Sequence, residues 1–338
     1  MIPVHNGAAL LARCLDALAR SAFKAFECIV VDDASSDAAA AIAVASGATV
    51  VALECRGGPG RARNRGAKIA RGEVLVFLDA DVCVHPDTLA RIDRHMREHP
   101  GAAAVIGSYD DEPPAAGIVS QYKNLLHHYV HQHSQPEAWT FWAGCGAIRR
   151  PAFAAVGGFD ESYTRPCVED IELGARLRHA NQQIDLDPDI QVTHLKRWTL
   201  TSLVVTDLRD RALPWLMLMW RDRTLPYDLN LRLGHRVSVV LVWLMTLAAG
   251  AAFIDGRAAI AVLAAAALLV ALNVDLYRFF ARKRGFAFAL ASIPLHWLYY
   301  WYCGLAVLVA PLWYAYRELR AAYRRNRRSA VLGGGTHG

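Results

Sequence analysis

The sequence of 338 residues contains seven cysteines, but no two of them are spaced as a C-x-x-C pair. Such pairs are typical of zinc ribbons and thiol redox sites, and an odd, scattered set of cysteines does not make a disulfide scaffold. The pattern therefore favours a reduced, intracellular environment. No signal peptide opens the sequence, and no internal repeat is visible in it.

Two common nucleotide-binding motifs are missing from the glycine-rich stretch at residues 56–67, which reads RGGPGRARNRGA. It fits neither the G-x-G-x-x-G pattern of dinucleotide-binding folds nor the G-x-x-x-x-G-K-[ST] pattern of P-loop NTPases, which disfavours NAD chemistry and ATP hydrolysis. The glycines let the backbone approach a ligand closely, and the helix that follows offers N–H groups to an anion. Its arginines fit this anion site, or simply a solvated basic helix.

Charged residues are scarce over residues 236–316, which hold three long uncharged segments at 237–254, 258–274 and 285–316. A helix needs about 20 apolar residues to cross a bilayer, and three such segments in succession are rare in a soluble domain. We therefore expect two to three transmembrane segments. The net charge of +6 comes largely from the arginine-rich tail at 317–338, so it does not predict a nucleic-acid footprint on the folded domain.

The first part of the chain alternates between apolar runs and amphipathic segments. Strands are expected at 27–31, 49–53 and 74–78, and helices after residue 7, at 38–46 and at 61–70. This alternation predicts an α/β fold with a mostly parallel sheet covered on both faces. In such sheets ligands bind outside the carboxyl ends of the strands.

Two pairs of carboxylates fall at those strand ends, namely Asp32 with Asp33 and Asp79 with Asp81. Residues i and i+2 of an extended chain point the same way, so Asp79 and Asp81 repel each other unless a cation lies between them. Mg²⁺ or Mn²⁺ would take these oxygen ligands and keep positions open for a diphosphate. Both acids also fit solvated turn residues. We expect the two pairs to face one crevice.

Six short segments then occur in a characteristic order over residues 1–197: PVHNG at 3–7, IVVDDASSD at 29–37, GRARNRGA at 60–67, FLDAD at 77–81, VGGFDE at 156–161 and ED at 169–170. In these segments the chain resembles the inverting family-2 glycosyltransferases of the GT-A fold, in their membrane-anchored bacterial form. One departure is that only Met1 and Ile2 precede PVHNG, where the family has a complete strand, so we expect the first strand to be truncated.

The resemblance implies a role for individual residues. Those implied to contact the nucleotide-sugar are Pro3, Val4, Asn6, Asp32, Asp33, Arg63, Asn64, Asp79 and Ala80. Those implied to hold Mn²⁺ or Mg²⁺ are Asp79, Asp81 and His194, although a lone histidine is more often an ordinary hydrogen-bonded one. The catalytic pair is Asp170, as general base, with Glu169. Those expected at the sugar or acceptor are Trp142, Gly144, Asp160 and Trp198, of which Trp142 fits core packing equally well.

The chemistry of sugar transfer explains why these residue types are needed. A nucleotide-sugar expels a diphosphate, on which negative charge develops, and a divalent ion and arginines stabilise that charge. A hydroxyl acceptor must lose a proton, which requires a positioned carboxylate. The acids at 169–172 open a helix, where the helix dipole alone also favours them. The preceding GGFDE turn favours the catalytic interpretation.

We expect four regions: a GT-A domain at 1–197, an interfacial amphipathic linker at 198–235, transmembrane segments at 236–316 and a basic tail at 317–338. The linker mixes apolar and charged residues and contains Pro214, which indicates a kinked interfacial helix. It has only imperfect versions of the Q-x-x-R-W motif of processive synthases. Transfer of a single sugar is therefore favoured over polymer synthesis.

The expected function is metal-dependent transfer from a UDP-, GDP- or dTDP-sugar to a lipid hydroxyl, at the bacterial inner membrane with the catalytic domain in the cytosol. A polyprenyl phosphate acceptor and an inactive membrane-bound scaffold remain alternatives. The side of the tail is open. Three complete spans would place its arginines outside, against the positive-inside tendency, whereas a break at Pro294 would return them to the cytosolic face, near anionic lipids.

Overall fold

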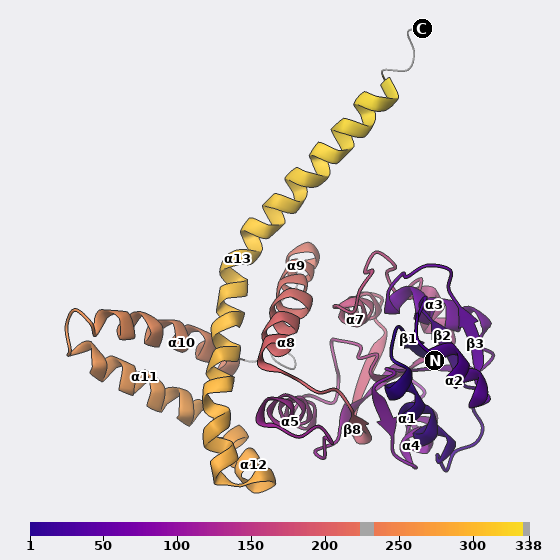
Figure 1. Cartoon of the computed structure of the whole chain (residues 1–338), viewed down its shortest axis with the longest axis horizontal. Coiled ribbons are helices and arrows are strands. Elements are labelled where there is room, and N and C mark those ends of the chain that lie inside the picture. Colours follow the sequence, from indigo (N-terminus) through magenta and orange to yellow (C-terminus); the bar gives the residue numbers. More distant parts are fainter. Residues whose placement is uncertain (224–232, 334–338) are drawn as a thin grey trace.

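Apolar, β-branched runs near the start of the chain form the strands that the sequence predicts. The computed structural model describes residues 1–223 and 233–333 (Figure 1). Its first sheet is parallel, in the order β1-β2-β3, with β1 (Ile2–Val4), β2 (Ile29–Asp32) and β3 (Thr49–Ala52). The expectation of parallel strands is confirmed for this sheet.

The second sheet has five strands in the order β4-β7-β6-β8-β5. Their bounds are β4 (Val74–Leu78), β7 (Cys145–Arg149), β6 (Ala102–Tyr109), β8 (Gln183–His194) and β5 (Val82–Val84). Only β6 and β8 pair in parallel, and the other three pairings are antiparallel, so this sheet is mixed rather than mostly parallel. Strand β5 follows β4 after only three residues and pairs with β8, and β7 pairs antiparallel to β6 although helix α5 (Ile118–Gln132) lies between them in the sequence.

Two hydrogen bonds join the sheets at Met1. Its amino group donates to the carbonyl of Val76 at 2.7 Å, and the N–H of Leu78 donates to the carbonyl of Met1 at 3.1 Å. In a parallel ladder, a residue on one strand forms hydrogen bonds with the two residues on either side of its partner on the other strand, as Met1 does with Val76 and Leu78. Strand β4 therefore lies beside β1, and the carboxyl ends of β2, β1 and β4 meet at one edge.

Helices cover both faces of the sheets, as alternating side chains require. The helices on one face are α1 (Ala8–Ala19), α2 (Ala39–Ala45) and α4 (Thr88–Glu98). Those on the other are α3 (Pro59–Ile69), α6 (Arg150–Ala155) and α7 (Glu169–His179). In β2, Val30 packs with the first group and Val31 with the second, and both are fully buried. Burial on both faces explains why this strand is continuously apolar.

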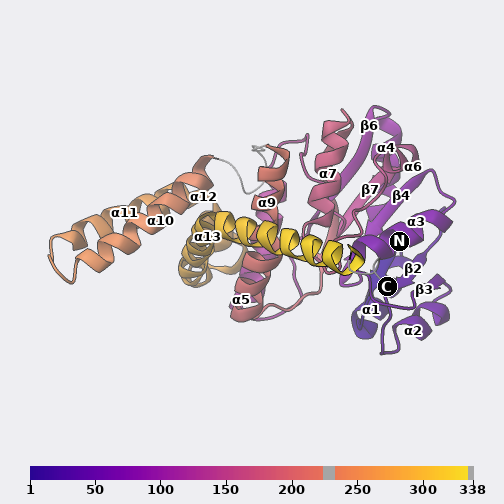
Figure 2. The same cartoon turned by 90° about the horizontal axis from the view of Figure 1, so that it is seen from above.

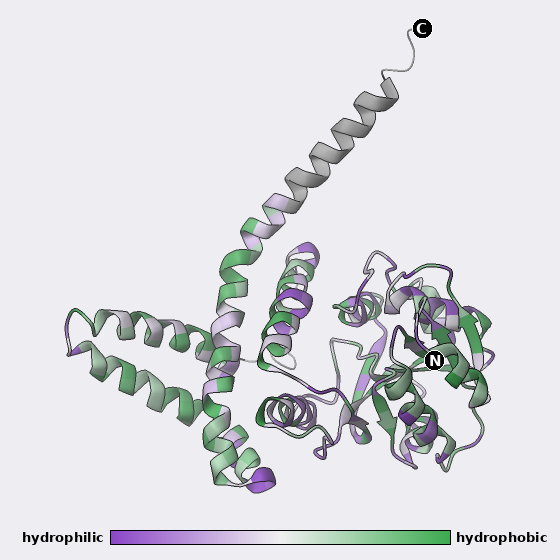
Figure 3. Cartoon of the chain, viewed as in Figure 1, coloured by the Kyte–Doolittle hydropathy of each residue, from purple (hydrophilic) through white to green (hydrophobic). Residues whose placement is uncertain are grey.

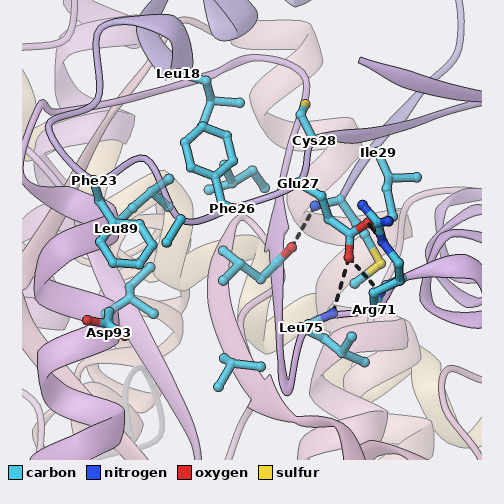
Figure 4. Close-up of a pocket in the computed structure, with 18 of the residues that line it drawn as sticks. Leu18, Phe23, Phe26, Glu27, Cys28, Ile29, Arg71, Leu75, Leu89 and Asp93 are labelled. Carbon is cyan, nitrogen blue, oxygen red and sulfur yellow. Dashed lines mark hydrogen bonds and ion pairs between the residues drawn. The ribbon is translucent and has the colours of Figure 1, made fainter. Parts of the chain in front are cut away.

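A cavity of about 580 Å³ lies at the amino-terminal ends of β2 and β4. Figure 4 shows Phe23, Phe26 and Leu89 at one side of it and Glu27 beside Arg71 at the other. The Glu27 carboxylate already accepts the backbone N–H of Arg71 at 2.5 Å. Because the cavity is mostly apolar and lies at the opposite strand ends from the paired aspartates, it is not the candidate site.

The described residues after Thr199 form helices joined by short connections. In order, the helices are α8 (Leu200–Val205), η1 (Thr206–Ala212), α9 (Leu213–Asp222), α10 (Leu233–Ala251), α11 (Ala258–Leu272), α12 (Val274–Arg284) and α13 (Phe286–Gly333). The first three are consecutive, with a π-helical turn in η1 and Pro214 at the second position of α9.

The break at Pro294, which the sequence left open as one alternative, does not occur, because α13 continues through both Pro294 and Pro311. A proline inside a helix costs about 3 kcal/mol, mainly by removing one backbone hydrogen bond. Burial of neighbouring side chains such as Tyr300 and Tyr302 offsets this cost.

Two helices are long and apolar enough to cross a membrane, namely α10 with 19 residues and the first 31 residues of α13. Helices α11 and α12 make a third candidate if the pair, bent by 67°, is counted as one. Figure 3 shows the apolar character of α10 and α11, and Figure 2 shows this pair extending away from the α/β domain.

A buried ion pair connects the α/β domain to these helices. Lys123, on α5 (Ile118–Gln132), donates to both carboxylate oxygens of Asp207 at 2.7 Å, and the hydroxyl of Tyr302 donates to the same carboxylate at 2.6 Å. Lys123 and Asp207 are each at most 4% exposed. Their mutual pairing and the hydroxyl satisfy charges that would be costly to bury alone. Helix α13 is thus fixed against the domain by a polar contact.

Candidate active site

A cavity of about 490 Å³ opens at the edge where β1, β2 and β4 end. This volume is within the range usual for small-molecule sites. The predicted site residues that line it are Pro3, Val4, Asn6, Asp33, Arg63, Asp79, Ala80, Asp81, Trp142, Glu169, Asp170, His194 and Trp198. The structure therefore brings together residues that are up to 195 positions apart in the sequence, from Pro3 to Trp198.

Four predicted site residues lie outside this lining: Asp32, Asn64, Gly144 and Asp160. Asp32 accepts the N–H of Ser35 at 3.0 Å and so stabilises the turn after β2. Gly144 has no room for a side chain, because an added Cβ would lie 2.7 Å from the ring of Trp142. These two residues shape the site rather than line it.

Asn64 and Asp160 also stabilise the backbone. The Asn64 amide donates to the carbonyl of Phe159 at 2.9 Å and accepts the N–H of the same residue at 2.8 Å. Asp160 accepts the N–H of Ser162 at 2.9 Å. Asn64 therefore connects α3 to the GGFDE turn, which positions the residues that precede α7.

The anion site at the start of α3 is occupied by the chain itself. The carboxylate of Asp33 accepts the N–H of Gly57 at 2.7 Å and the N–H of Gly58 at 2.8 Å. Gly58 has φ +89°, and a Cβ there would lie 2.6 Å from the carbonyl oxygen of Tyr163, so only glycine fits. The glycine-rich stretch thus receives an internal carboxylate in this structure, where the sequence suggested a ligand anion.

Arg63 lies between two acids. Its guanidinium donates to Asp79 at 2.6 Å and to Glu169 at 2.9 Å, and the arginine is 4% exposed. The pairings connect α3, the end of β4 and the start of α7. Arg63 therefore compensates the charge of two predicted site acids and fixes their positions. Asp79 is held by this arginine instead of sharing a compact three-ligand group with Asp81 and His194.

Asp81 and His194 face each other in the cavity, with 3.5 Å between a carboxylate oxygen and Nε2. The other ring nitrogen, Nδ1, is 2.6 Å from the side-chain oxygen of Asn124. An amide oxygen only accepts, so Nδ1 carries the proton, and in a neutral ring Nε2 presents its lone pair toward Asp81. The ring of Tyr109 stacks on His194 at 4.2 Å.

Two acceptors that face each other fit a shared cation. Asn124 orients His194 from behind, as outer-shell partners of metal-binding histidines do. The residues present therefore fit a divalent ion, and an imidazole ligand suits Mn²⁺ better than Mg²⁺, which prefers oxygen ligands.

Asp170 lies in the first turn of α7 and has a different environment. One of its oxygens accepts the N–H of Ala143 at 3.2 Å and the other accepts that of Ile171 at 2.8 Å. Burial, and then the neighbouring Glu169 carboxylate, raise the pKa of Asp170 to about 7. A carboxylate with this pKa takes up a proton readily near neutral pH, which suits a general base.

Four residues at or beside the cavity were missed by the sequence analysis as site residues: Tyr109, Asn124, Lys196 and Arg211. The Lys196 ammonium lies 4.0 Å from the centre of the Trp198 ring, and Arg211 lies 3.0 Å from Nε2 of His127. Lys196 precedes Arg197-Trp198 and Arg211 lies four residues before Trp215; these two segments are the imperfect versions of the Q-x-x-R-W motif, and they offered a weak signal. Asn124 offered none, because it meets His194 only through the packing of α5.

The fold is shared with a solved glycosyltransferase. The mannosyltransferase PcManGT from Pyrobaculum calidifontis, solved in complex with GDP-Man and Mn²⁺, superposes with a TM-score of 0.59 over 91% of this chain and 85% of that one, at 18% identity. At that identity the likeness shows the fold alone. The α/β domain is therefore a GT-A glycosyltransferase fold.

Sequence comparison identifies the family. Residues 1–157 match the family model described as glycosyl transferase family 2. Residues 1–157 are therefore those of a glycosyl transferase family 2 domain.

Two curated relatives cover part of the chain. Validoxylamine A glucosyltransferase from Streptomyces hygroscopicus subsp. jinggangensis is 30% identical over 219 residues, which is 54% of this chain and 51% of that protein. Glycosyltransferase GlyG from Streptococcus pneumoniae is 28% identical over 114 residues, which is 32% of this chain and 38% of that protein. The matches thus span about half or less of these relatives.

Proposed function

We propose that the protein transfers a single sugar from a nucleotide-diphosphate sugar to a lipid acceptor at a membrane, with inversion at the sugar carbon. The observation that carries the proposal is the presence, in one cavity, of the Asp81–His194 pair and of Asp170 with a pKa of about 7. The Asp81–His194 pair suits a cation that binds a diphosphate, and Asp170 suits removal of a proton from the acceptor. The neighbour of known structure binds GDP-Man and Mn²⁺, which supports this donor class.

Each residue then has a defined task. Asp81 and His194 would hold Mn²⁺, which when bound supplies positive charge to the leaving diphosphate. Arg63 keeps Asp79 in place at the end of β4, where this carboxylate faces the donor. Asp170 accepts the proton of the acceptor hydroxyl as its oxygen bonds to the sugar carbon and the bond from that carbon to the diphosphate oxygen breaks. The proton ends on the carboxylate of Asp170 and the electron pair of the broken bond on the diphosphate.

The acceptor would approach from the helical side of the cavity. There the lining includes Trp198 and Lys196 together with Arg211 on η1 and Trp215 on α9, and both of these helices pack against α13. Aromatic rings beside a membrane surface suit a lipid. The two cations favour a second candidate, in which the acceptor is a lipid phosphate such as a polyprenyl phosphate. Such a nucleophile is already ionised and does not need Asp170, which gives a means of distinguishing the two.

The α10–α11 hairpin is the part that we propose to cross the membrane. The two helices pack against each other, and outward-facing apolar residues such as Leu247 and Ile260 are exposed along them. At the tip of the hairpin, Phe253 and Ile254 are more than 90% exposed. Exposed apolar area of this extent requires a lipid environment or a partner.

Helix α13 has a different orientation, and we propose that its first half lies along the membrane surface. In Figures 1 and 2 it runs across the α10–α11 hairpin rather than beside it, and it packs against α5 and α9 of the rest of the protein. Of the five Trp or Tyr residues at 297–302, Trp297, Tyr299 and Trp301 are only partly buried. These amphipathic rings are enriched at the membrane interface.

This arrangement predicts the side of the tail. A hairpin returns the chain to its original side, so the arginine-rich residues 317–338 are expected on the same side as the α/β domain, in agreement with the positive-inside tendency. The measurement is a fluorescent or phosphatase reporter fused after residue 338. A matched reporter inserted at Gly256, in the hairpin tip, should report the opposite side. Opposite results for the tail would exclude the hairpin topology.

A donor screen tests the proposed function itself. Membranes containing the protein are incubated with labelled UDP-, GDP- and dTDP-sugars and Mn²⁺, and the lipid products are extracted into organic solvent. One donor class is expected to label a lipid, and chelation of divalent ions should abolish the labelling. If no donor binds or reacts in the presence of Mn²⁺, the enzyme proposal fails and the alternative of an inactive membrane scaffold is favoured.

A further inference from the structure

A second group of polar residues lies away from the candidate active site, where the end of α4 meets the first part of β8. His95 and His99 are one helical turn apart, and His99 directly follows the last residue of α4. Asp185 and Asp187 are on β8. None of the four residues lines the cavity that holds Asp81 and Asp170.

The group has the geometry of a metal site. A ring nitrogen from each of His95 and His99 and a carboxylate oxygen of Asp185 all lie within 4.8 Å of one another, and no other such group occurs among residues 1–223 and 233–333. Nε2 of His95 is 3.0 Å from the Asp185 oxygen. This separation suits two ligands that share one ion at about 2.0–2.1 Å from each.

The surroundings orient the ligands. The second nitrogen of His95, Nδ1, lies 3.0 Å from a carboxylate oxygen of Asp187, which leaves Nε2 directed at Asp185. A carboxylate behind a histidine is the usual outer-shell partner of a metal-binding imidazole. Gln183 donates to the other oxygen of Asp185 at 2.7 Å and so leaves one oxygen available. The histidine rings stack, with 4.3 Å between their centres.

The backbone around the group is also fixed. Arg149, at the end of β7, donates to the carbonyls of Met96 at 2.6 Å and of His99 at 3.2 Å, which holds the last turn of α4. Asp185 pairs with Val105 in the ladder between β6 and β8. The ligands therefore come from two rigid elements, which a metal ion would join.

We propose that His95, His99 and Asp185 bind a zinc ion, with water in the fourth position and Asp187 as the outer-shell partner of His95. Two imidazoles and one carboxylate suit Zn²⁺, whereas Mg²⁺ prefers oxygen ligands alone. The ion attaches the end of α4 to β8, and so stabilises the frame formed by α4, β5 and β8. This proposal does not depend on the proposed transferase activity.

The competing explanation needs no metal, because a protonated His95 can bridge the two aspartates on its own. Metal counting distinguishes the two. The full chain in detergent is stripped with a chelator, then dialysed against Zn²⁺ in the presence of excess Mg²⁺, and bound zinc is measured by mass spectrometry. His99→Ala is the main variant, because its exposed side chain can be removed with little risk to the fold.

The wild type is expected to bind one Zn²⁺ more per chain than His99→Ala. His179→Ala, which removes an exposed histidine from the end of α7, should retain the wild-type count. Asp187→Asn should weaken zinc binding by about 10- to 100-fold, as outer-shell changes do. Co²⁺ in place of Zn²⁺ should give the visible absorption of a tetrahedral site, and His99→Ala should lose it. Equal zinc content in wild type and His99→Ala, or no zinc in the wild type, would overturn the proposal.

Discussion

Replacing Asp170 by Asn is expected to slow transfer to a hydroxyl acceptor by about 10²- to 10⁴-fold, the usual contribution of a general base. An amide keeps the size of the side chain and still accepts the N–H of Ala143, but it cannot take the proton of the acceptor. Binding of the donor should change little, because the Asp81–His194 pair is untouched. The rate is measured from labelled lipid and the donor affinity by calorimetry.

Asp160→Asn is the matched control, because this acid belongs to the same segment but lies outside the cavity lining. It should retain nearly full activity. If Asp170→Asn is fully active toward a lipid hydroxyl, Asp170 is not the base. If the labelled product is instead a lipid phosphate, a small effect of Asp170→Asn is the expected result, since that acceptor has no proton to lose.

The pH profile provides a further control for Asp170. Its pKa of about 7 means that the carboxylate is mostly protonated below pH 7 and mostly ionised above it. Only the ionised form acts as a base, so kcat/KM of the wild type should rise as the pH increases through about 7. The Asp170→Asn variant should lack this step in its residual activity.

Replacing Asp81 by Asn is expected to remove Mn²⁺-dependent donor binding, because it takes the negative charge from the pair with His194. His194→Ala should have a similar effect. Asn124→Ala should weaken Mn²⁺ affinity by about 10- to 100-fold, since Asn124 orients His194 without touching the ion. The measurement is calorimetric titration of a nucleoside diphosphate with and without Mn²⁺.

Asp187→Asn serves as the control for this series, because it changes an aspartate near the other histidine cluster and should leave Mn²⁺-dependent donor binding unchanged. Unaltered Mn²⁺-dependent binding in both Asp81→Asn and His194→Ala would contradict the assignment of this pair. An effect of Asp81→Asn alone would indicate that His194 is only an ordinary packed histidine.

The sequence predicts those parts of the site that depend on local pattern. Apolar runs define β2 and β4, and the acids that follow them necessarily lie at the carboxyl edge of the sheet. The sequence does not predict which partner each side chain takes. Asp33 binds the glycine-rich stretch, Arg63 binds Asp79, and Asn124 binds a histidine 70 residues later. These contacts depend on distant elements.

Local sequence patterns also do not predict the direction of strand β7 or the continuity of helix α13. The strand at β7 resembles any other buried strand, and its antiparallel pairing with β4 follows from the path of the chain that precedes it. Pro294 is normally a helix breaker, yet α13 continues because its aromatic side chains pack against neighbouring helices. In both places tertiary structure outweighs the local signal.

Strand β8 carries Asp185 near its start and His194 at its end. Nine residues of extended chain span about 30 Å, and electrostatic screening in physiological salt acts within about 8 Å. Charge placed at one end of the strand is therefore not felt at the other. A metal ion bound by Asp81 and His194 and a metal ion bound by His95, His99 and Asp185 would therefore bind and dissociate independently, without cooperativity.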